Sequence, residues 1–208
     1  RPNTLWENFD DGGNMMTYNM ARRYVTSVNA DNTSALSTRK AVYGATFPFS
    51  SQHTDRYMED SVMDAYITRT SMYGGGPWIF MNRIDEMTAK DIAFARKEVD
   101  LFKSIRRRLR DGRFFHLMPP GENRYDALQS ADPSTGASIV FVMKEPGAPA
   151  SGITLRLKGL DPETAYTVTF QDRPAVLNMT GAQLMGPGLR LNIQEPRGGE
   201  LVYVNSPR

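Results

Sequence analysis

The chain has 208 residues, of which 40% are hydrophobic and 23% charged, an ordinary composition for a globular protein with one large domain or two small ones. The formal net charge of +2 argues against nucleic acid as the main partner, and the lack of cysteine excludes disulfides, zinc–thiolate sites and a cysteine nucleophile. No apolar run reaches the length of a membrane span, so no membrane partner is predicted. The sequence does not indicate a cellular compartment.

The first half of the chain alternates short apolar runs with helical stretches. A strand is predicted to end at Trp6, two more are predicted at residues 24–28 and 78–81, and helices are predicted at residues 15–23, 35–42 and 60–72. The longest helix is predicted to begin at Thr88, which Asp91 follows at the spacing of a helix cap, and to end before Gly112. Strands that alternate with helices favour an α/β architecture with parallel strands.

After Gly112 the pattern changes to short β-type runs separated by turn residues such as Pro-Pro-Gly and Asp-Pro-Ser. The runs cover residues 114–118, 138–144, 153–157, 166–170, 189–193 and 201–204. This pattern is typical of an antiparallel β-sandwich. The predicted fold class is therefore α/β followed by all-β, with domains at residues 1–111 and 112–208.

Polar residues follow two of the predicted strands. Glu-Asn and Asp-Asp-Gly-Gly lie within residues 7–13, and Asn-Ala-Asp-Asn-Thr occupies residues 29–33. In parallel α/β barrels the residues beyond the carboxyl ends of the strands line the active site, and carboxyl groups there suit general acid/base chemistry. Glycoside hydrolysis needs two such groups, about 5 Å apart when configuration is retained. Composition alone favours a plainer interpretation, in which these residues form a turn and a helix N-cap.

The spacing of these motifs carries a resemblance to a known family. Glu7-Asn8, Gly12-Gly13, Asp31-Asn32-Thr33 and Tyr43-Gly44 occur in the order and at the spacing of the family 36 α-galactosidases of glycoside hydrolase clan D. Further similar segments are Met72-Tyr73-Gly74, Trp78 to Met81, Leu155 to Tyr166, and Thr180-Gly181 through Gly188-Leu189. The resemblance spans nearly the whole chain.

The resemblance implies that residues 1–111 are the C-terminal portion of a (β/α)8 catalytic barrel and that residues 112–208 are a C-terminal antiparallel β-sandwich domain. It also implies a retaining α-glycoside hydrolase that cleaves terminal α-linked sugars by double displacement. Asp31 matches the family's general acid/base, whereas the nucleophile is expected upstream of Arg1. The residues expected to bind the sugar are Glu7, Asn8, Asp10, Asp11, Gly12 and Asn29.

The sequence also departs from the family pattern close to the expected sugar site. Phe9-Asp10-Asp11 replaces Cys-Ser-Ser, and Val28-Asn29-Ala30 replaces Trp-Thr-Ser before the acid/base. The sugar and its linkage therefore stay open. The alternatives are an α-N-acetylgalactosaminidase, another α-glycosidase of the clan, or a non-catalytic carbohydrate-binding fragment.

We expect no cofactor and no metal site, because the Asp, Glu and His spacings match no helical metal motif. The expected partners are an oligosaccharide or glycoside substrate and the upstream part of the same enzyme, and self-association into a homo-oligomer stays open. The 208-residue chain by itself is expected to be inactive, because an incomplete barrel leaves strand edges bare.

Overall fold

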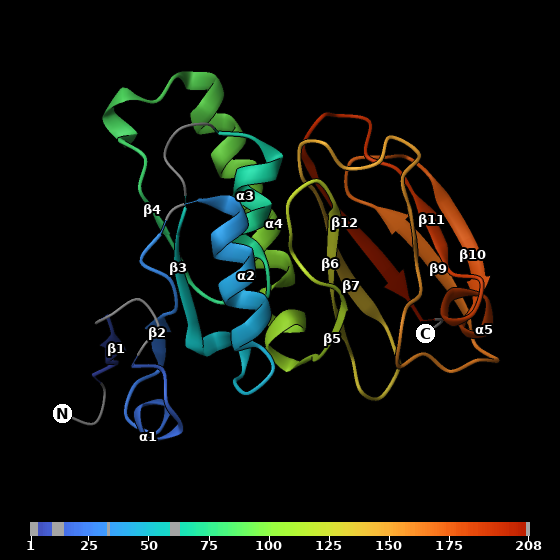
Figure 1. Ribbon diagram of the computed structural model, residues 1–208, viewed down its shortest axis with the longest axis horizontal. Coiled ribbons are helices and arrows are strands. Elements are labelled where there is room, and N and C mark those ends of the chain that lie inside the picture. The colour runs from blue at the N-terminus through green and yellow to red at the C-terminus, as the bar shows by residue number, and fades with distance from the viewer. Residues whose placement is uncertain (1–3, 10–14, 33, 59–62, 207–208) are drawn as a thin grey trace. The chain divides into compact units, whose positions relative to one another are not determined.

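The structure, a computed structural model, describes residues 4–9, 15–32, 34–58 and 63–206. The chain divides into two compact units, Arg1–Arg110 and Asp111–Arg208 (Figure 1). Within the described part of the chain, no helix combines the length and apolar character that crossing a membrane requires.

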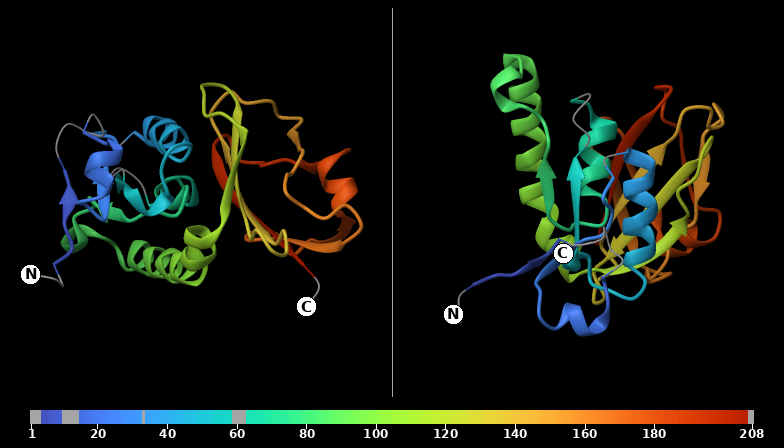
Figure 2. Two further views of the ribbon diagram at one scale, coloured as in Figure 1. Left: turned by 90° about the horizontal axis from the view of Figure 1, so that it is seen from below. Right: turned by 60° about the vertical axis from the view of Figure 1, so that its left-hand side comes forward.

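The first unit is built on a parallel sheet of four strands in the order β1-β2-β3-β4, which is also their order in the chain. The strands are β1 (Glu7–Asn8), β2 (Thr26–Val28), β3 (Thr54–Met58) and β4 (Trp78–Phe80). The longer helices are α2 (Ala35–Ala45), α3 (Ala65–Met72) and α4 (Ala89–Asp111), and the short ones are α1 (Tyr18–Ala21), η2 (Ser51–His53) and η3 (Ile84–Glu86). Figure 2 shows this alternation of strand and helix from two further directions. The predicted parallel α/β arrangement is therefore present.

Capping side chains explain two corrections to the predicted helices. The helix predicted at residues 15–23 is reduced to α1, because the Thr17 hydroxyl caps its N-terminus by accepting from the Met20 N–H at 3.3 Å. Of the helix predicted at residues 60–72, residues 60–62 lie outside the described residues, and α3 begins at Ala65 because Asp64 Oδ1 caps it by accepting from the Ile67 N–H at 2.8 Å. In both cases the helix begins directly after the capping residue.

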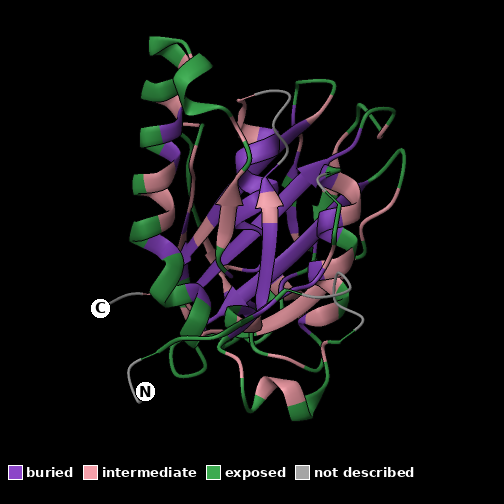
Figure 3. Ribbon diagram, turned by 90° about the vertical axis from the view of Figure 1, so that its left-hand side faces the viewer, coloured by how far each residue is buried: buried purple, intermediate pink, exposed green. Residues whose placement is uncertain are grey.

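The long helix α4 begins as predicted. The Asp91 N–H donates to Thr88 Oγ1, and the Thr88 N–H donates back to Asp91 Oδ2, each at 3.2 Å. This reciprocal pair is a capping box with an aspartate in the position of the usual glutamate. The helix buries one stripe, which includes Ala95, Ile105 and Leu109, and exposes its opposite face (Figure 3).

Charged groups are buried among the helices of the first unit. The Arg69 Nε and Glu98 Oε2 atoms lie 3.6 Å apart, and the two side chains are 1% and 0% exposed. The Thr68 hydroxyl donates to the same Glu98 oxygen at 3.3 Å. A buried carboxylate and guanidinium are tolerated only when they neutralise each other, so this pair ties α3 to α4.

The glycines before β4 form a tight turn. Gly74 and Gly75 have positive φ values of 78° and 81°. A Cβ at Gly76 would lie 2.1 Å from the backbone oxygen of Thr54, whereas a Cβ at Gly44 in α2 would meet nothing within 4 Å. Gly76 is therefore required by close backbone approach, whereas Gly44 is not.

This contrast gives a matched pair of variants. Gly76→Ala is expected to destabilise the first unit by about 2 kcal/mol or more through overpacking, whereas Gly44→Ala is expected to stabilise it by about 0.5–1 kcal/mol through helix propensity. Both tryptophans, Trp6 and Trp78, lie in the first unit, so tryptophan fluorescence during urea unfolding measures its stability. Equal effects of the two variants would contradict the tight packing at Gly76.

The second unit is a β-sandwich. A six-stranded antiparallel sheet has the order β10-β9-β12-β7-β6-β5, and a two-stranded antiparallel sheet has the order β11-β8. The elements are β5 (Arg113–Met118), β6 (Tyr125–Ala131), β7 (Ser138–Lys144), β8 (Ile153–Leu155), β9 (Ala165–Phe170), β10 (Val176–Thr180), α5 (Gly181–Met185), β11 (Leu189–Leu191) and β12 (Gly198–Asn205). Each of the six predicted β-type runs overlaps one of these strands.

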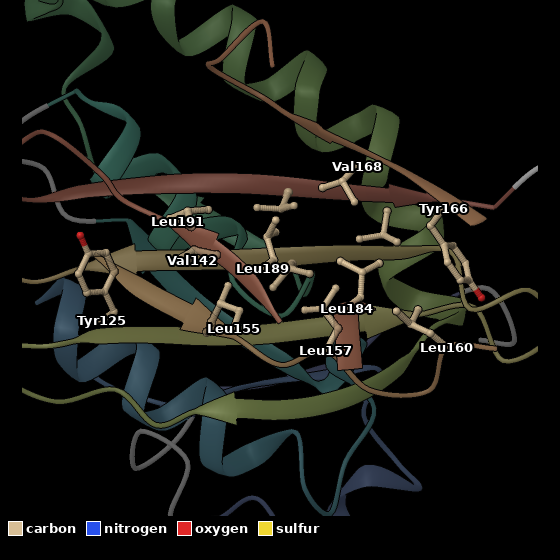
Figure 4. Close-up of a cluster of buried hydrophobic side chains, with 14 of the residues drawn as sticks. Tyr125, Val142, Leu155, Leu157, Leu160, Tyr166, Val168, Leu184, Leu189 and Leu191 are labelled. Atoms are coloured by element: carbon tan, nitrogen blue, oxygen red, sulfur yellow. The ribbon is translucent and has the colours of Figure 1, made fainter. Parts of the chain in front are cut away.

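The hydrophobic core of the second unit lies between its two sheets. Val142 and Val168 from the large sheet meet Leu155 and Leu189 from the small one, and Leu184 of α5 is fully buried among them (Figure 4). Two strands of the second unit were not predicted, β6 and β10. Strand β6 has the small or polar residues Ala127, Gln129 and Ser130 at its centre, and most of β10 is exposed at the sheet edge. Neither strand has the apolar run that a sequence search detects.

A second matched pair tests this core. Leu184→Ala is expected to cost about 3 kcal/mol, because it removes a completely buried side chain and leaves a cavity. Leu177→Ala makes the same change at a side chain that is 40% exposed and should cost less than about 1 kcal/mol. Amide hydrogen exchange of β7 and β12 measures both effects. Similar protection in the two variants would show that α5 is not part of the core.

Candidate functional site

One face of the parallel sheet collects acidic and aromatic side chains. Glu7 pairs with Thr26, Val28 pairs with Asp55, and side chains alternate between the two faces along each strand. Glu7, Asp55 and Tyr57 therefore lie on one face. The rings of Phe9 and Tyr57 confirm this register, because they meet edge to face with their centroids 6.0 Å apart.

Asp55 and Glu7 form a pair of carboxyl groups on this face. Asp55 is 3% exposed, and burial raises the pKa of its carboxyl group from 3.8 to about 7. The hydrogen bond with Glu7 and the charge of Glu7 add to this rise, whereas the N–H and the guanidinium of Arg56 oppose it. Asp55 therefore holds a proton at a pH where an ordinary aspartate has lost it.

Arg56, on the opposite face, is fully buried. Its Nη1 donates to the backbone oxygen of Tyr73 at 3.0 Å and to Thr54 Oγ1 at 3.3 Å. Burial lowers the pKa of the guanidinium to about 10. The backbone N–H of Arg56 donates to Asp55 Oδ1 at 2.6 Å and thereby fixes one oxygen of the buried carboxyl group.

Asp31 lies in a bend directly after β2, and its side chain is exposed. Among the residues that the structure describes, its carboxylate has no hydrogen-bond partner. The adjacent Asn32 forms the local turn instead, since its Oδ1 accepts from the Ser34 N–H at 2.6 Å. The N-cap position of α2 is Ser34, so Asp31 itself is not the cap.

Tyr57 lies within electrostatic range of all three carboxyl groups. Burial is the largest cause that raises the pKa of its phenol, and the negative charges of Asp31, Asp55 and Glu7 add to it in that order. The predicted acid/base, Asp55 and Glu7 thus all influence the phenol of Tyr57, which lies near the carboxyl end of β3. We call Glu7, Asp31, Asp55 and Tyr57 the acidic face.

The other predicted site residues are placed differently. Asn8 is buried on the opposite face of the sheet from Glu7, and its Nδ2 donates to the backbone oxygen of Met15 at 3.4 Å. Asn29 is 8% exposed, its N–H donates to the backbone oxygen of Asp55 at 3.1 Å, and its side-chain atoms have no partner in the described part of the chain. The predicted residues Asp10, Asp11 and Gly12 lie outside the described residues.

Sequence reasoning missed Asp55 and Tyr57 because it missed β3. No strand was predicted at residues 54–58, because the sequence Thr-Asp-Arg-Tyr-Met has two ionisable residues in place of an apolar run. The available signal was period-two alternation, in which Thr54, Arg56 and Met58 share one face and Asp55 and Tyr57 share the other.

Trp78 does not belong to the acidic face. It pairs with Arg56 and therefore lies on the opposite side of the sheet, where its ring meets that of Phe102 edge to face at 5.8 Å. A cavity of about 550 Å³ in the first unit is lined there by Gln52, Gly75, Pro77, Trp78, Phe102, Arg106, Arg107 and Arg110. Trp78 is half-buried and packs against Phe102 on this side of the sheet. No group of three or more His, Cys, Asp or Glu side chains in the described residues is arranged to hold a metal ion.

Comparisons with known proteins relate this geometry to an enzyme family. No family model matches the chain. Among curated proteins, α-galactosidase AgaA of Geobacillus stearothermophilus is 29% identical over 176 residues, which cover 80% of this chain and 24% of the relative. α-Galactosidase C of Emericella nidulans is 22% identical over 212 residues, which cover 98% of this chain and 27% of the relative. The chain therefore spans about a quarter of the length of these relatives.

Solved structures give the same result for the fold. The glycoside hydrolase family 36 α-galactosidase AgaB of Geobacillus stearothermophilus matches 99% of this chain with a TM-score of 0.82 at 22% identity, over 29% of its own length. The α-galactosidase of Lactobacillus brevis matches 100% with a TM-score of 0.81 at 18% identity, over 30% of its own length. The chain is family 36 α-galactosidase-like. It has the fold of the C-terminal region of those enzymes, which confirms the resemblance found in the sequence.

Some of these structures contain ligands. Variants of AgaA were solved with raffinose, with stachyose and with 1-deoxygalactonojirimycin. In each of these three comparisons the match covers 99% of this chain and 29% of the AgaA variant.

Proposed function

We propose that this chain is the C-terminal part of a retaining α-glycoside hydrolase of α-galactosidase type. On this proposal residues 1–111 complete a (β/α)8 barrel whose other strands lie upstream, and residues 112–208 form its C-terminal sandwich domain. The order β1-β2-β3-β4 of the parallel sheet suits consecutive strands of such a barrel. The single observation that carries the proposal is the exposed carboxylate of Asp31, which has no hydrogen-bond partner among the described residues, in a chain similar to α-galactosidases.

In the proposed reaction, Asp31 is the general acid and then the general base. In the first step Asp31 gives its proton to the glycosidic oxygen as that bond breaks, and an upstream carboxylate bonds to the sugar carbon. In the second step Asp31 takes a proton from water, whose oxygen replaces the enzyme carboxylate at the same carbon. The configuration is retained because the carbon is attacked twice.

The acidic face also suits sugar binding. Carboxylates accept hydrogen bonds from sugar hydroxyls, and Glu7 is exposed at the end of β1 to do so. Phe9, which is 58% exposed, and Tyr57 offer aromatic surface for the apolar side of a pyranose. Raffinose and stachyose, the sugars found in the AgaA variants, define the class of α-galactoside that we propose as substrate.

A panel of aryl α-glycosides tests the proposal. The complete protein that contains this chain is expected to release the aryl group from the α-galactoside in preference to the α-glucoside and the β-galactoside. Preference for the α-N-acetylgalactosaminide would keep the reaction but change the sugar. Absence of turnover on every member, together with binding of oligosaccharides, would support the non-catalytic interpretation and overturn the proposal.

A further inference from the structure

The proposed reaction makes no use of the cavity that Trp78 and Phe102 line on the other side of the parallel sheet. Its volume is about 550 Å³, within the range of pockets that bind small organic molecules. The lining comes from two parts of the first unit, namely the segments at the start of β3 and β4 and the last third of α4. We call it the arginine cavity, because Arg106, Arg107 and Arg110 are among its lining residues.

The two walls of the arginine cavity are packed directly against each other. The Trp78 ring meets the ring of Phe102 on α4 edge to face, and it also packs against Phe80 with the ring centroids 4.8 Å apart. Gly75 approaches the same helix closely, because a Cβ at this position would lie 2.5 Å from the Cβ of Leu109. The turn before β4 is therefore fixed against α4, and the cavity is already formed without a ligand.

The arginine cavity is lined by positive charge alone. None of the described residues that line it is acidic. Arg106 and Arg107 are exposed, and within the described part of the chain neither forms a hydrogen bond or an ion pair. Cations in the last turn of a helix stabilise its negative end, and this effect accounts for Arg108 and Arg110. Arg106 and Arg107 precede that turn, so the end of the helix does not account for them.

These features suit a phosphate monoester better than a neutral sugar. A phosphate group brings nearly two negative charges and three acceptor oxygens, and a planar guanidinium binds such oxygens in pairs. The half-buried indole of Trp78 offers a flat apolar surface on which a pyranose ring or a base can stack. The volume of the cavity leaves room for such a group beside the phosphate.

We propose that the arginine cavity binds a phosphate monoester, with the phosphate group on Arg106 and Arg107 and the organic group on the ring of Trp78. Trp78 begins β4, whereas Asp31 follows the last residue of β2. Because the four strands are parallel, these two residues lie at opposite ends of the sheet. Binding in the cavity is therefore independent of the role proposed for Asp31.

Titration calorimetry of the complete protein with glucose 6-phosphate, AMP, inorganic phosphate and glucose tests this proposal. We expect at least one of the two organic phosphates to bind with a Kd below about 1 mM, and the tighter of the two identifies the organic group as a sugar or a base. Inorganic phosphate should bind about tenfold more weakly, because it cannot stack on Trp78. Glucose lacks the charge and should not compete with either organic phosphate.

A matched pair of double variants makes the test specific. Arg106→Gln with Arg107→Gln removes two exposed charges and should weaken binding of the organic phosphate by about 10- to 100-fold, since hydrogen bonds between charged groups are lost. Arg96→Gln with Lys97→Gln makes the same change at two adjacent exposed cations of α4 that do not line the cavity. This control should keep the affinity within about twofold, because salt screens charges at a distance.

Tryptophan fluorescence shows where the ligand binds. Binding should change the emission of the unaltered protein, and the change should be missing in Trp78→Phe. The other tryptophan, Trp6, directly precedes β1, which lies at the opposite edge of the sheet from β4. Asp31→Asn should bind the organic phosphate with unaltered affinity.

Four results would overturn the proposal. They are a lack of binding by both organic phosphates, an inorganic phosphate that binds as tightly as the organic ones, equal losses of affinity in the two double variants, and a loss of affinity in Asp31→Asn that places the ligand on the acidic face. Loss of glycoside hydrolysis in Asp31→Asn tests only the proposed function, so the two proposals can fail separately.

Discussion

Asp31→Asn in the complete protein is expected to lower kcat on natural α-glycosides by about 10²- to 10⁴-fold, the usual contribution of a general acid/base. The loss should be much smaller for the first step with aryl glycosides, because a good leaving group departs with little protonation. Asparagine has nearly the same shape as aspartate but cannot give or take the proton. Steady-state kinetics on one oligosaccharide and one aryl glycoside of the same sugar measure this difference.

A matched control excludes a general effect of removing a charge. Asp100→Asn makes the same change on the exposed face of α4, where the side chain is 67% exposed and lies 3.8 Å from Lys103. Its activity should equal that of the unaltered protein on both substrates. If Asp31→Asn behaved like Asp100→Asn, Asp31 would not be the acid/base.

Glu98→Ala is expected to be the most destabilising of the packing variants, with a loss of about 3–5 kcal/mol in the first unit. The substitution removes the carboxylate that lies beside the buried Arg69 guanidinium. It also removes one of two acceptors of the Thr68 hydroxyl, which donates to the backbone oxygen of Asp64 at 2.9 Å as well. The cost is mainly that of breaking a buried ion pair from one side. Urea unfolding followed by tryptophan fluorescence measures it.

The control for this variant is the same substitution at an exposed ion pair. Glu86 lies 2.6 Å from Arg83, but the two side chains are 61% and 67% exposed. Glu86→Ala should change stability by less than about 1 kcal/mol, because water screens the pair and solvates each partner alone. A loss for Glu98→Ala as small as that for Glu86→Ala would show that water reaches the buried pair.

The parts of the fold that could be predicted from the sequence are those in which local pattern and tertiary packing agree. Helix α4 has its cap residues and a buried stripe, and both survive in the structure. The strands of the sandwich that were predicted have apolar or β-branched residues, as in β7 with Ile139 and Val142. In these elements the local sequence pattern was sufficient, without knowledge of the elements that pack against them.

The elements that escaped prediction depend on their partners. Strand β3 is buried although its sequence contains Asp55 and Arg56, because burial and the neighbouring Glu7 raise the pKa of Asp55 and the backbone oxygen of Tyr73 accepts from Arg56. Neither contact has a signature in the local sequence. The carboxyl pair was missed for the same reason, since its members lie 48 positions apart (55 − 7 = 48) on strands that are two places apart in the sheet.

The candidate site was predicted in part. Composition alone favoured a cap or turn at residues 29–33, and only the resemblance to α-galactosidases singled out Asp31. The structure adds that Asn32 rather than Asp31 forms the turn. The residues around Asp10 remain predictions, as does the role of Asn29.

A structure of the complete protein with a bound sugar tests the central claim most directly. We expect the Asp31 carboxyl group to lie about 5 Å from a second carboxyl group contributed by an upstream strand, with the anomeric carbon between them. A sugar bound elsewhere, or an Asp31 side chain with no second carboxyl group within about 10 Å, would contradict the proposal that this chain supplies the acid/base of a retaining glycosidase.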